Sequence, residues 1–266
     1  MNSIKYFFGK GEYDDVLTCL STTKVNSYKT SSLPLAQFWR PSKSLDKFIS
    51  KLKKEQGIDI STFEAYFEYP TECLKENVRL QYSKPSMTDL MLMNKSFQIA
   101  IEGKYTEYSE SHYETIKEWN RDNEVHKNKI KENWFSYLKD CQATNKTELI
   151  EDIPYQFLHR TASACFKCEN RIPVLVYQLF YDDENKEKEE QFVKELEKWA
   201  GMLGLSEKIK FLVFEVKITN IDIVEKKYKG ARSDLFLIMK ELKDEPIFEF
   251  DWNTIRIRNI TSKSNE

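Results

Sequence analysis

Two short apolar runs joined by a polar pair constrain the fold of this chain more than any other feature of its sequence. The runs MTDLMLM and FQIAI flank Asn94-Lys95, and this arrangement predicts a β-hairpin over residues 87–105. With Asn94-Lys95 as a two-residue loop, the pairing places Asp89 opposite Ala100. A loop of odd length would turn one strand over, so the prediction depends on an even loop.

Three ionisable residues stand in this apolar frame. Alternate residues along a strand share a face, so Asp89, Glu102 and Lys104 are predicted to project from the same side of the hairpin. Two carboxylates that converge in a partly buried site repel each other, and one is protonated unless a cation lies between them. Mg²⁺ or Mn²⁺ beside Lys104 would remove the conflict and allow metal-assisted hydrolysis of a phosphodiester. The alternative is a hairpin whose exposed face simply carries polar residues.

The composition is that of a folded protein with a heavily solvated surface. Of the 266 residues, 40% are hydrophobic and 32% are charged. No run approaches about 18 consecutive apolar residues, so no membrane span is expected. The five cysteines lack the spacing of a disulfide framework and the N-terminal residues do not resemble a signal peptide, so the sequence predicts a cytoplasmic protein. The net charge of -2 neither indicates nor excludes binding to nucleic acid.

The order of predicted elements indicates an α/β fold, with a central mixed β-sheet flanked by helices in one domain over residues 1–266. Residues 106–150, rich in Glu and Lys, are expected to form a helical insertion. Periodicity predicts helices over 42–57, 155–168 and 188–205, strands over 172–182 and 208–218, and one or two edge strands in 246–260.

Residues 61–69, STFEAYFEY, fit two structures. Ser61 and Glu64 have the spacing of a capping box, which favours a helix, whereas the dense aromatic residues favour a strand. Pro70 is expected to end either one.

Asp89, followed by Glu102-Gly103-Lys104, resembles the signature of the PD-(D/E)XK nuclease superfamily, which is built on a restriction-endonuclease-like core. The resemblance implies that Asp89 and Glu102 bind the metal, that the Gly103 carbonyl adds a further ligand, and that Lys104 serves the attacking water. Thr88 stands where the family usually has a proline.

The resemblance also implies further site residues. The superfamily often adds an acidic residue from an upstream element, and Glu68 is the first candidate for this metal ligand, ahead of Glu64. Several branches place a Gln, with a basic residue four positions later, on the helix after the catalytic strands. Gln156 and Arg160 fit, since positions i and i+4 share a helix face. Gln156 would then be catalytic and Arg160 would bind nucleic acid, the alternative being an exposed polar helix face.

His159 lies next to Arg160 in the sequence but about 100° away around the predicted helix. It is therefore assigned no role. Cys165 and Cys168 form the only CxxC motif, and without a second CxxC or paired histidines they are expected to be buried thiols rather than zinc ligands.

The function that the resemblance implies is hydrolysis of DNA phosphodiester bonds by a metal-dependent endonuclease, of a restriction or repair type. Mg²⁺ or Mn²⁺ would be the cofactor and DNA the partner, and enzymes of this kind are often homodimers. Lysine-rich stretches at 127–131 and 226–232 are candidates for phosphate contacts. The alternative is a non-catalytic relative that keeps the restriction-endonuclease-like core as a DNA- or protein-binding module.

Overall fold

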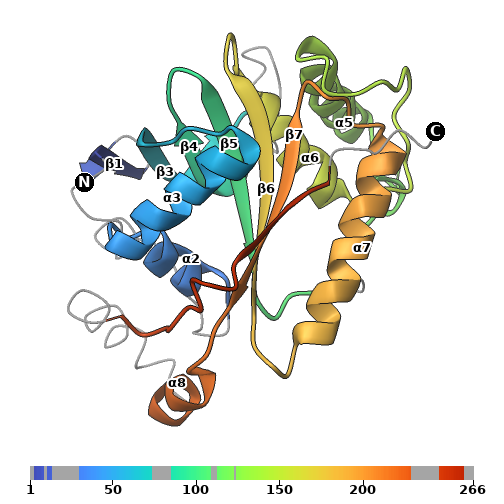
Figure 1. The fold of residues 1–266 in the computed structure, drawn as a ribbon. Helices are drawn as coiled ribbons and strands as arrows, with labels where there is room; N and C mark the ends of the chain where they lie inside the picture. The colour runs from blue at the N-terminus through green and yellow to red at the C-terminus, as the bar shows by residue number, and fades with distance from the viewer. Residues whose placement is uncertain are drawn as a thin grey trace.

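An eight-stranded mixed β-sheet forms the centre of the protein in its computed structural model (Figure 1). The strand order is β2-β1-β3-β4-β5-β6-β7-β8. The structure describes residues 3–8, 11–13, 30–73, 85–108, 113–122, 124–228 and 246–260, and seven helices lie in this part of the chain. The predicted α/β class, with a central mixed sheet and flanking helices, is confirmed.

The strands are β1 (Ser3–Phe8), β2 (Gly11–Tyr13), β3 (Thr62–Thr71), β4 (Ser86–Met93), β5 (Phe97–Lys104), β6 (Ile172–Tyr181), β7 (Lys210–Lys217) and β8 (Arg256–Asn259). The helices are α2 (Ser32–Phe38), α3 (Lys43–Gln56), α4 (Ile116–Trp119), α5 (Val125–Asp140), α6 (Tyr155–Cys165), α7 (Lys186–Leu203) and α8 (Ile221–Tyr228).

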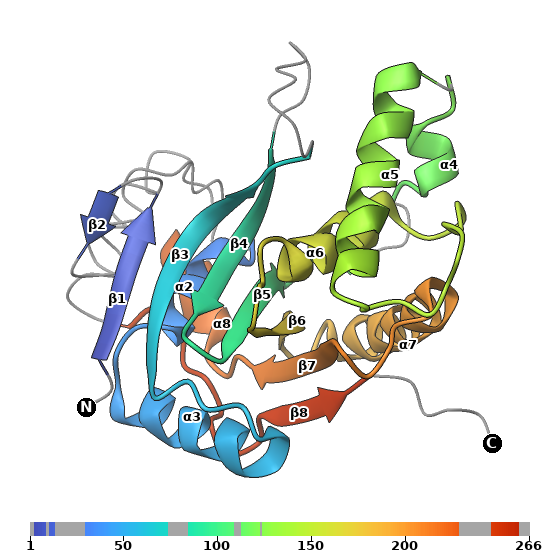
Figure 2. The ribbon, with the colours of Figure 1, turned by 90° about the horizontal axis from the view of Figure 1, so that it is seen from above.

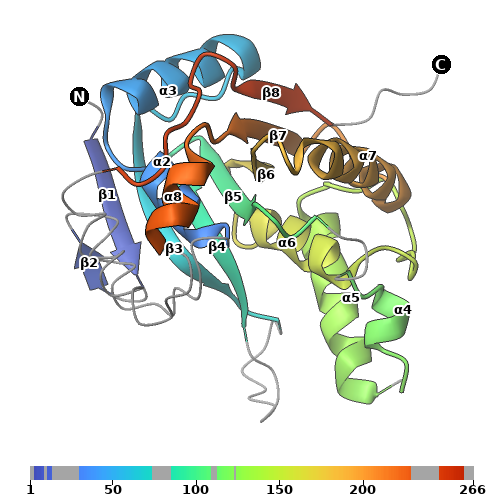
Figure 3. The ribbon, with the colours of Figure 1, turned by 90° about the horizontal axis from the view of Figure 1, so that it is seen from below.

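Helices cover both faces of the sheet (Figures 2 and 3). α2, α3 and α8 lie over one face, where Phe38 and Phe214 belong to the core, and α5, α6 and α7 lie over the other, where Phe157 and Phe211 do. The central strands β5, β6 and β7 run parallel and are buried on both sides, as their continuous apolar runs predict. Their carboxyl ends therefore meet at one edge of the sheet.

The boundaries of α3 follow directly from the sequence. The Ser42 side chain accepts a hydrogen bond from the backbone N–H of Leu45 at 3.0 Å, which caps the first turn. Gly57 ends the helix in the left-handed conformation, with a φ of 68°. The helix predicted over 42–57 is confirmed, with its apolar face buried.

The predicted hairpin is present as β4 and β5, but its pairing register is displaced by two residues. Ala100 pairs with Met91 and not with Asp89. The turn is built on Asn94, whose Oδ1 accepts hydrogen bonds from the backbone N–H groups two and three residues later, each at 2.8 Å. The loop therefore begins one residue later than predicted, but it still has an even length, so the predicted sharing of one face is retained.

Residues 62–69 lie in strand β3, and the capping-box alternative does not form. The backbone N–H of Ser61 instead donates to Asp59 Oδ1 at 3.0 Å. The prediction that Pro70 ends the element is wrong, since β3 continues to Thr71. Beyond Phe67, β3 is paired with β4 and with no other described strand, and a strand paired on one side tolerates a proline.

Four elements have no counterpart among the predicted ones, and one of them is the helix α8 that follows β7. β1 and β2 extend the sheet beyond β3, with β1 parallel to β3, and the short helix α2 is almost entirely buried. Within residues 106–150, α4 and α5 form the predicted helical insertion. α5 packs along α6, so the insertion contributes to the core on that face of the sheet (Figure 2).

A group of buried charged side chains lies at the end of β7, beside the start of α7. Glu215 accepts hydrogen bonds from Arg258 at 2.5 and 3.0 Å, and Glu189 accepts one from Lys186 at 2.7 Å. Burial, opposed by Lys186 and reinforced by the neighbouring Glu215 carboxylate, raises the pKa of Glu189 to about 7. Glu189 therefore retains a proton over a pH range in which an exposed glutamate is ionised.

Replacing Glu189 with Gln should remove one source of pH-dependent stability. Because the folded protein holds this proton more tightly than the unfolded chain, stability is present at low pH and is lost as the pH rises from about 4.5 through about 7. We expect Glu189→Gln to exceed the wild type in free energy of unfolding by about 1–3 kcal/mol at pH 8, with a smaller difference at pH 5. Urea denaturation followed by circular dichroism measures this.

The exposed Glu187 on the same helix supplies the matched control. Glu187→Gln should change the free energy of unfolding little at either pH. An effect of Glu189→Gln that is the same at pH 5 and pH 8 would contradict the raised pKa.

Candidate active site

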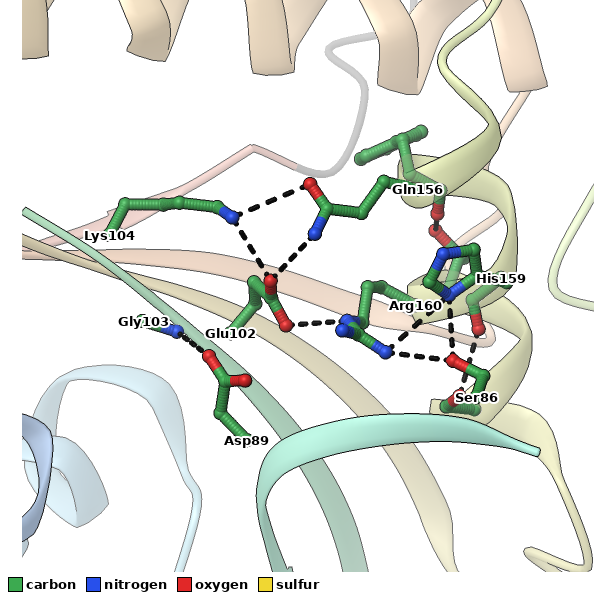
Figure 4. Close-up of polar contacts among 11 residues, drawn as sticks. Ser86, Asp89, Glu102, Gly103, Lys104, Gln156, His159 and Arg160 are labelled. Atoms are coloured by element: carbon green, nitrogen blue, oxygen red, sulfur yellow. Dashed lines mark hydrogen bonds and ion pairs between the residues drawn. The ribbon is translucent and has the colours of Figure 1, made fainter. Parts of the chain in front are cut away.

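Five of the predicted site residues lie together at the end of β5, on the face of the sheet that α6 covers (Figure 4). They line one cavity of about 290 Å³. Asp89 comes from β4, Glu102 and Lys104 from β5, and Gln156 and Arg160 from α6. The alternation along β4 and β5 and the i, i+4 spacing on α6 therefore point all five side chains to the same place, as predicted.

Glu102 is the centre of the polar contacts. Its Oε1 accepts hydrogen bonds from Lys104 Nζ at 3.1 Å and from Gln156 Nε2 at 2.9 Å. Its Oε2 accepts one from Arg160 Nε at 2.5 Å. The Gln156 side chain also accepts a hydrogen bond from Lys104 at 3.4 Å, which closes the ring of contacts.

The charges of this network stabilise one another. Burial acts to raise the pKa of Glu102, but Arg160 and Lys104 outweigh it and hold that pKa below its ordinary value. Burial acts to lower the pKa of Lys104, and Glu102 outweighs it, so that this pKa lies above its ordinary value. Glu102 is therefore ionised and Lys104 is protonated at neutral pH.

Asp89 is in a different state. Its Oδ2 accepts a hydrogen bond from the backbone N–H of Gly103 at 2.9 Å, and its Oδ1 accepts none from the described residues. Burial, and then the Glu102 carboxylate, raise the pKa of Asp89 to about 7, although Arg160 and Lys104 oppose the shift. The predicted conflict between two converging carboxylates is thus met by a proton on Asp89 while Glu102 stays ionised.

Gly103 allows α2 to lie close to the site. A Cβ at position 103 would stand 3.1 Å from the Cβ of Ser31 and 3.5 Å from Leu35 Cδ2. Ser31 is the N-cap residue of the buried helix α2 and Leu35 lies within it, so a side chain at 103 would require this helix to shift by a few tenths of an ångström. The glycine between Glu102 and Lys104 thus lets one side of β5 carry the charges while the other side meets α2.

Glu68 lies beside the site in an unusual conformation. The residues before and after it pair with β4, but Glu68 itself does not, and the register places it across from Asp89. Its φ is 50°, in the left-handed region that residues other than glycine rarely adopt. Burial raises the pKa of Glu68, Arg160 opposes the shift and Glu102 reinforces it. Such electrostatic coupling places Glu68 near the network.

Glu64, the second upstream candidate, has different neighbours. Its side chain is exposed, and its carboxylate accepts a hydrogen bond from the Tyr66 hydroxyl at 2.7 Å. It pairs with Met93 at the hairpin end of β4, which is the end away from Asp89. Of the two upstream candidates, only Glu68 lies beside the site, and it does not line the cavity.

His159, which was given no role, contacts the same network. Arg160 Nη1 donates a hydrogen bond to Ser86 Oγ at 2.8 Å, and Ser86 Oγ lies 2.8 Å from His159 Nδ1 (Figure 4). As predicted from the angle around the helix, His159 does not point toward Glu102. Ser86, at the start of β4, nevertheless contacts both His159 and Arg160. The signal that was missed is a contact between distant parts of the chain, which no local pattern contains.

The donor set at the site fits a divalent cation held by two carboxylates. Among the described residues, no group of three His, Cys, Asp or Glu side chains is placed to hold a metal ion, so the predicted set of Asp89, Glu102 and Glu68 is not preassembled. Asp89 and Glu102 nevertheless face one cavity, and Mg²⁺ typically uses one or two carboxylates and keeps several waters. A cation there would also relieve the repulsion that raises the pKa of Asp89.

Both residues of the CxxC motif are buried, as predicted. Their neighbour Cys141 was not anticipated: its Sγ lies 2.6 Å from Cys168 Sγ and donates to the Cys165 carbonyl at 3.2 Å. These thiols lie at the far end of α6 from Gln156, so they take no part in the candidate site.

Two of the three lysines of 127–131 make ion pairs within the protein. Lys127 lies 3.4 Å from Glu124, and Lys131 lies 2.5 Å from Glu151. In the second lysine-rich stretch, residues 229–232 lie outside the described residues.

Fold and site define an α/β protein with a carboxylate–lysine cavity at one edge of a mixed sheet. The chain belongs to the family described as Domain of unknown function (DUF6946), whose model matches residues 11–240. No curated protein and no solved structure matches the chain. None of the helices described here is both long enough and apolar enough to cross a membrane.

Asp89 should titrate near pH 7 in the metal-free protein. Carboxyl ¹³C NMR of aspartate-labelled protein follows its ionisation directly. Lys104→Met removes a positive charge that lowers this pKa, so the midpoint for Asp89 should move upward. Asp59 serves as the internal control, because its hydrogen bond with Lys53 lowers its pKa to about 2. A wild-type midpoint for Asp89 near 3.8 would contradict the arrangement described.

Proposed function

We propose that this chain is a metal-dependent nuclease with a restriction-endonuclease-like core that hydrolyses DNA phosphodiester bonds. The observation that carries the proposal is the convergence of Asp89, Glu102 and Lys104 on one cavity, next to Gln156 and Arg160. The Glu-Gly-Lys order on β5 and the acidic residue on the neighbouring strand are the pattern that the PD-(D/E)XK resemblance requires. A DNA substrate, Mg²⁺ or Mn²⁺ as cofactor, a cytoplasmic location and a homodimer belong to this proposal.

Asp89 and Glu102 would hold the divalent cation, which when bound supplies charge stabilisation to the phosphate and a more acidic water. The proton on Asp89 has to leave before this carboxylate can bind a cation, and a pKa of about 7 makes that loss easy near neutral pH. Glu102 is already ionised and needs no such step.

Lys104 would orient the attacking water and stabilise negative charge on the phosphate. It does not remove the proton from that water, because it is itself protonated and its pKa lies above the ordinary value. Gln156 fixes the position of Lys104 by accepting one of its hydrogen bonds and fixes Glu102 by donating another.

Arg160 would serve the site in two ways. Its Nε and Nη1 are engaged with Glu102 and Ser86, which fixes the plane of the guanidinium. Its Nη2 donates to no group among the described residues, and the side chain lines the cavity. A phosphate oxygen is a suitable acceptor for that nitrogen, which agrees with the predicted role of Arg160 in binding nucleic acid.

A non-catalytic DNA- or protein-binding module is the second candidate, and one observation favours it. Both oxygens of Glu102 are already satisfied by Lys104, Gln156 and Arg160. A cation would have to share Glu102 with these donors, whereas a purely structural network needs no cation at all. Metal binding therefore separates the two candidates.

Substitutions that preserve shape should abolish cleavage. Asp89→Asn should leave the fold intact, whereas Glu102→Gln leaves Lys104 and Arg160 without their counter-ion and should also lower the melting temperature. Asp89→Asn and Glu102→Gln keep the side-chain volume but remove the charges that hold the metal, and Lys104→Met should lower the cleavage rate by at least about 100-fold. Supercoiled plasmid, linear duplex and single-stranded DNA are incubated with each variant and Mg²⁺ or Mn²⁺. Circular dichroism and thermal unfolding verify the fold of every variant.

Glu64→Gln is the matched control, because Glu64 is an acidic residue of β3 that lies away from the cavity. It should cleave at the wild-type rate, and EDTA should stop cleavage in both. Cleavage that persists in all three site variants would rule out the assignment. If the wild type neither cleaves DNA nor binds Mn²⁺ in a calorimetric titration, the binding-module candidate is the one supported.

A further inference from the structure

A chain of hydrogen bonds behind the candidate site runs from Arg160 through Ser86 to His159. We propose that Ser86 and neutral His159 act as a positioning relay that fixes the Arg160 guanidinium against Glu102. The consequence of the relay for cleavage rests on the proposed nuclease function, but the relay itself is defined by contacts that can be tested without any activity. Ser86 and His159 are positioning residues, since neither lines the cavity.

The direction of each hydrogen bond follows from what the groups can do. A guanidinium only donates, so Ser86 Oγ must accept the hydrogen bond from Arg160 Nη1, which measures 2.8 Å. The Ser86 hydroxyl proton is assigned to His159 Nδ1, also at 2.8 Å, because Arg160 Nη1, which can only donate, lies 3.5 Å from the same ring nitrogen. Nδ1 must be unprotonated to accept it. The ring is therefore the neutral tautomer that carries its proton on Nε2.

The surroundings of His159 favour this neutral ring. Its ring centroid lies 4.9 Å from that of Tyr155 and 6.1 Å from that of Trp134, so aromatic side chains flank it. The charged groups that act on it are Arg160 and Lys104, both positive. Burial, together with these two charges, lowers the pKa of His159 well below its ordinary value.

The relay joins the elements that carry the two carboxylates. Ser86 begins β4, three residues before Asp89, and Arg160 lies on α6 and bonds to Glu102 on β5. Arg160 is thus held at one end by a carboxylate of β5 and at the other by a hydroxyl of β4. Loss of the relay would free the guanidinium to rotate about its bond to Glu102 and would loosen the spacing between Asp89 and Glu102.

The first measurement is the tautomer of His159. Long-range ¹⁵N–¹H NMR of imidazole-labelled protein at pH 7 distinguishes protonated from unprotonated ring nitrogens, and His159→Asn identifies the signals among the three histidines. The relay requires an unprotonated Nδ1 and a protonated Nε2. The opposite tautomer, or a doubly protonated ring at pH 7, would overturn it.

The second measurement follows the Arg160 Nε–H signal in proton-exchange NMR. Ser86→Ala and His159→Phe remove a link, so this proton should exchange with water faster than in the wild type. His159→Asn should preserve slow exchange, because the Asn Oδ1 accepts a hydrogen bond close to the place of Nδ1. Ser136→Ala is the control, since the Ser136 hydroxyl donates to the Asn133 carbonyl on α5 and bonds to no other group in the part of the chain that the structure describes. Unchanged exchange in Ser86→Ala would overturn the relay.

A third comparison separates this inference from the proposed function. If the protein binds Mn²⁺ or cleaves DNA, Ser86→Ala and His159→Phe should lower the Mn²⁺ affinity or the cleavage rate by about 10–100-fold. His159→Asn should retain most of the wild-type value. If the Arg160 Nε–H exchanges faster in Ser86→Ala and His159→Phe than in the wild type, but neither the wild type nor any variant cleaves DNA, the relay is supported and the nuclease proposal is rejected. Wild-type cleavage by Ser86→Ala and His159→Phe would reject a positioning role.

Discussion

The ionised carboxylate of Glu102 is the constraint on which the arrangement of this sheet edge depends. It is only 3% exposed, and a buried charge of this kind destabilises a protein by several kcal/mol unless it is paired and hydrogen-bonded. Lys104 supplies one partner from the same strand, and Arg160 supplies the other from α6. Helix α6 must therefore adopt one rotation about its own axis and one position along that axis relative to β5. This also fixes the position of the insertion helix α5, which packs on α6.

The site could be predicted from sequence to the extent that it depends on periodicity. Alternation along β4 and β5 requires only that the connecting loop has an even length, so the shared face of Asp89, Glu102 and Lys104 survives the two-residue error in register. That error came from Asn94, whose side chain can end a strand as readily as begin a loop. The i, i+4 relation on α6 is equally robust, because it is a property of any helix.

What could not be predicted depends on contacts between distant segments. β1 lies against β3, and α2 lies under Gly103, only because the assembled sheet offers a free edge and a close approach there. The left-handed conformation of Glu68 and the bond from Ser86 to His159 have the same origin. No propensity favours either, and each is stable only once the strands and α6 are in place.

The carboxyl ends of the central strands carry two acidic pairs with the same arrangement. Lys104, Leu179 and Glu215 follow one another across β5, β6 and β7, so the Glu102 network and the Glu215 network are neighbours on the same row. In each, one glutamate is ionised between a lysine and an arginine, while a second carboxyl, Asp89 or Glu189, has a pKa of about 7. Below about pH 7, Asp89 and Glu189 therefore each hold a proton, although a charge count from the sequence gives each of them a negative charge.

These two retained protons change the isoelectric point of the folded protein. The sequence alone gives an isoelectric point of about 6.1, with every carboxyl assigned its ordinary pKa. Near that pH the folded protein carries Asp89 and Glu189 largely uncharged, and the neutral His159 offsets part of the gain. The native protein should therefore focus at a higher pH than the same chain in urea, and a divalent cation that displaces the proton of Asp89 should shift the mobility again.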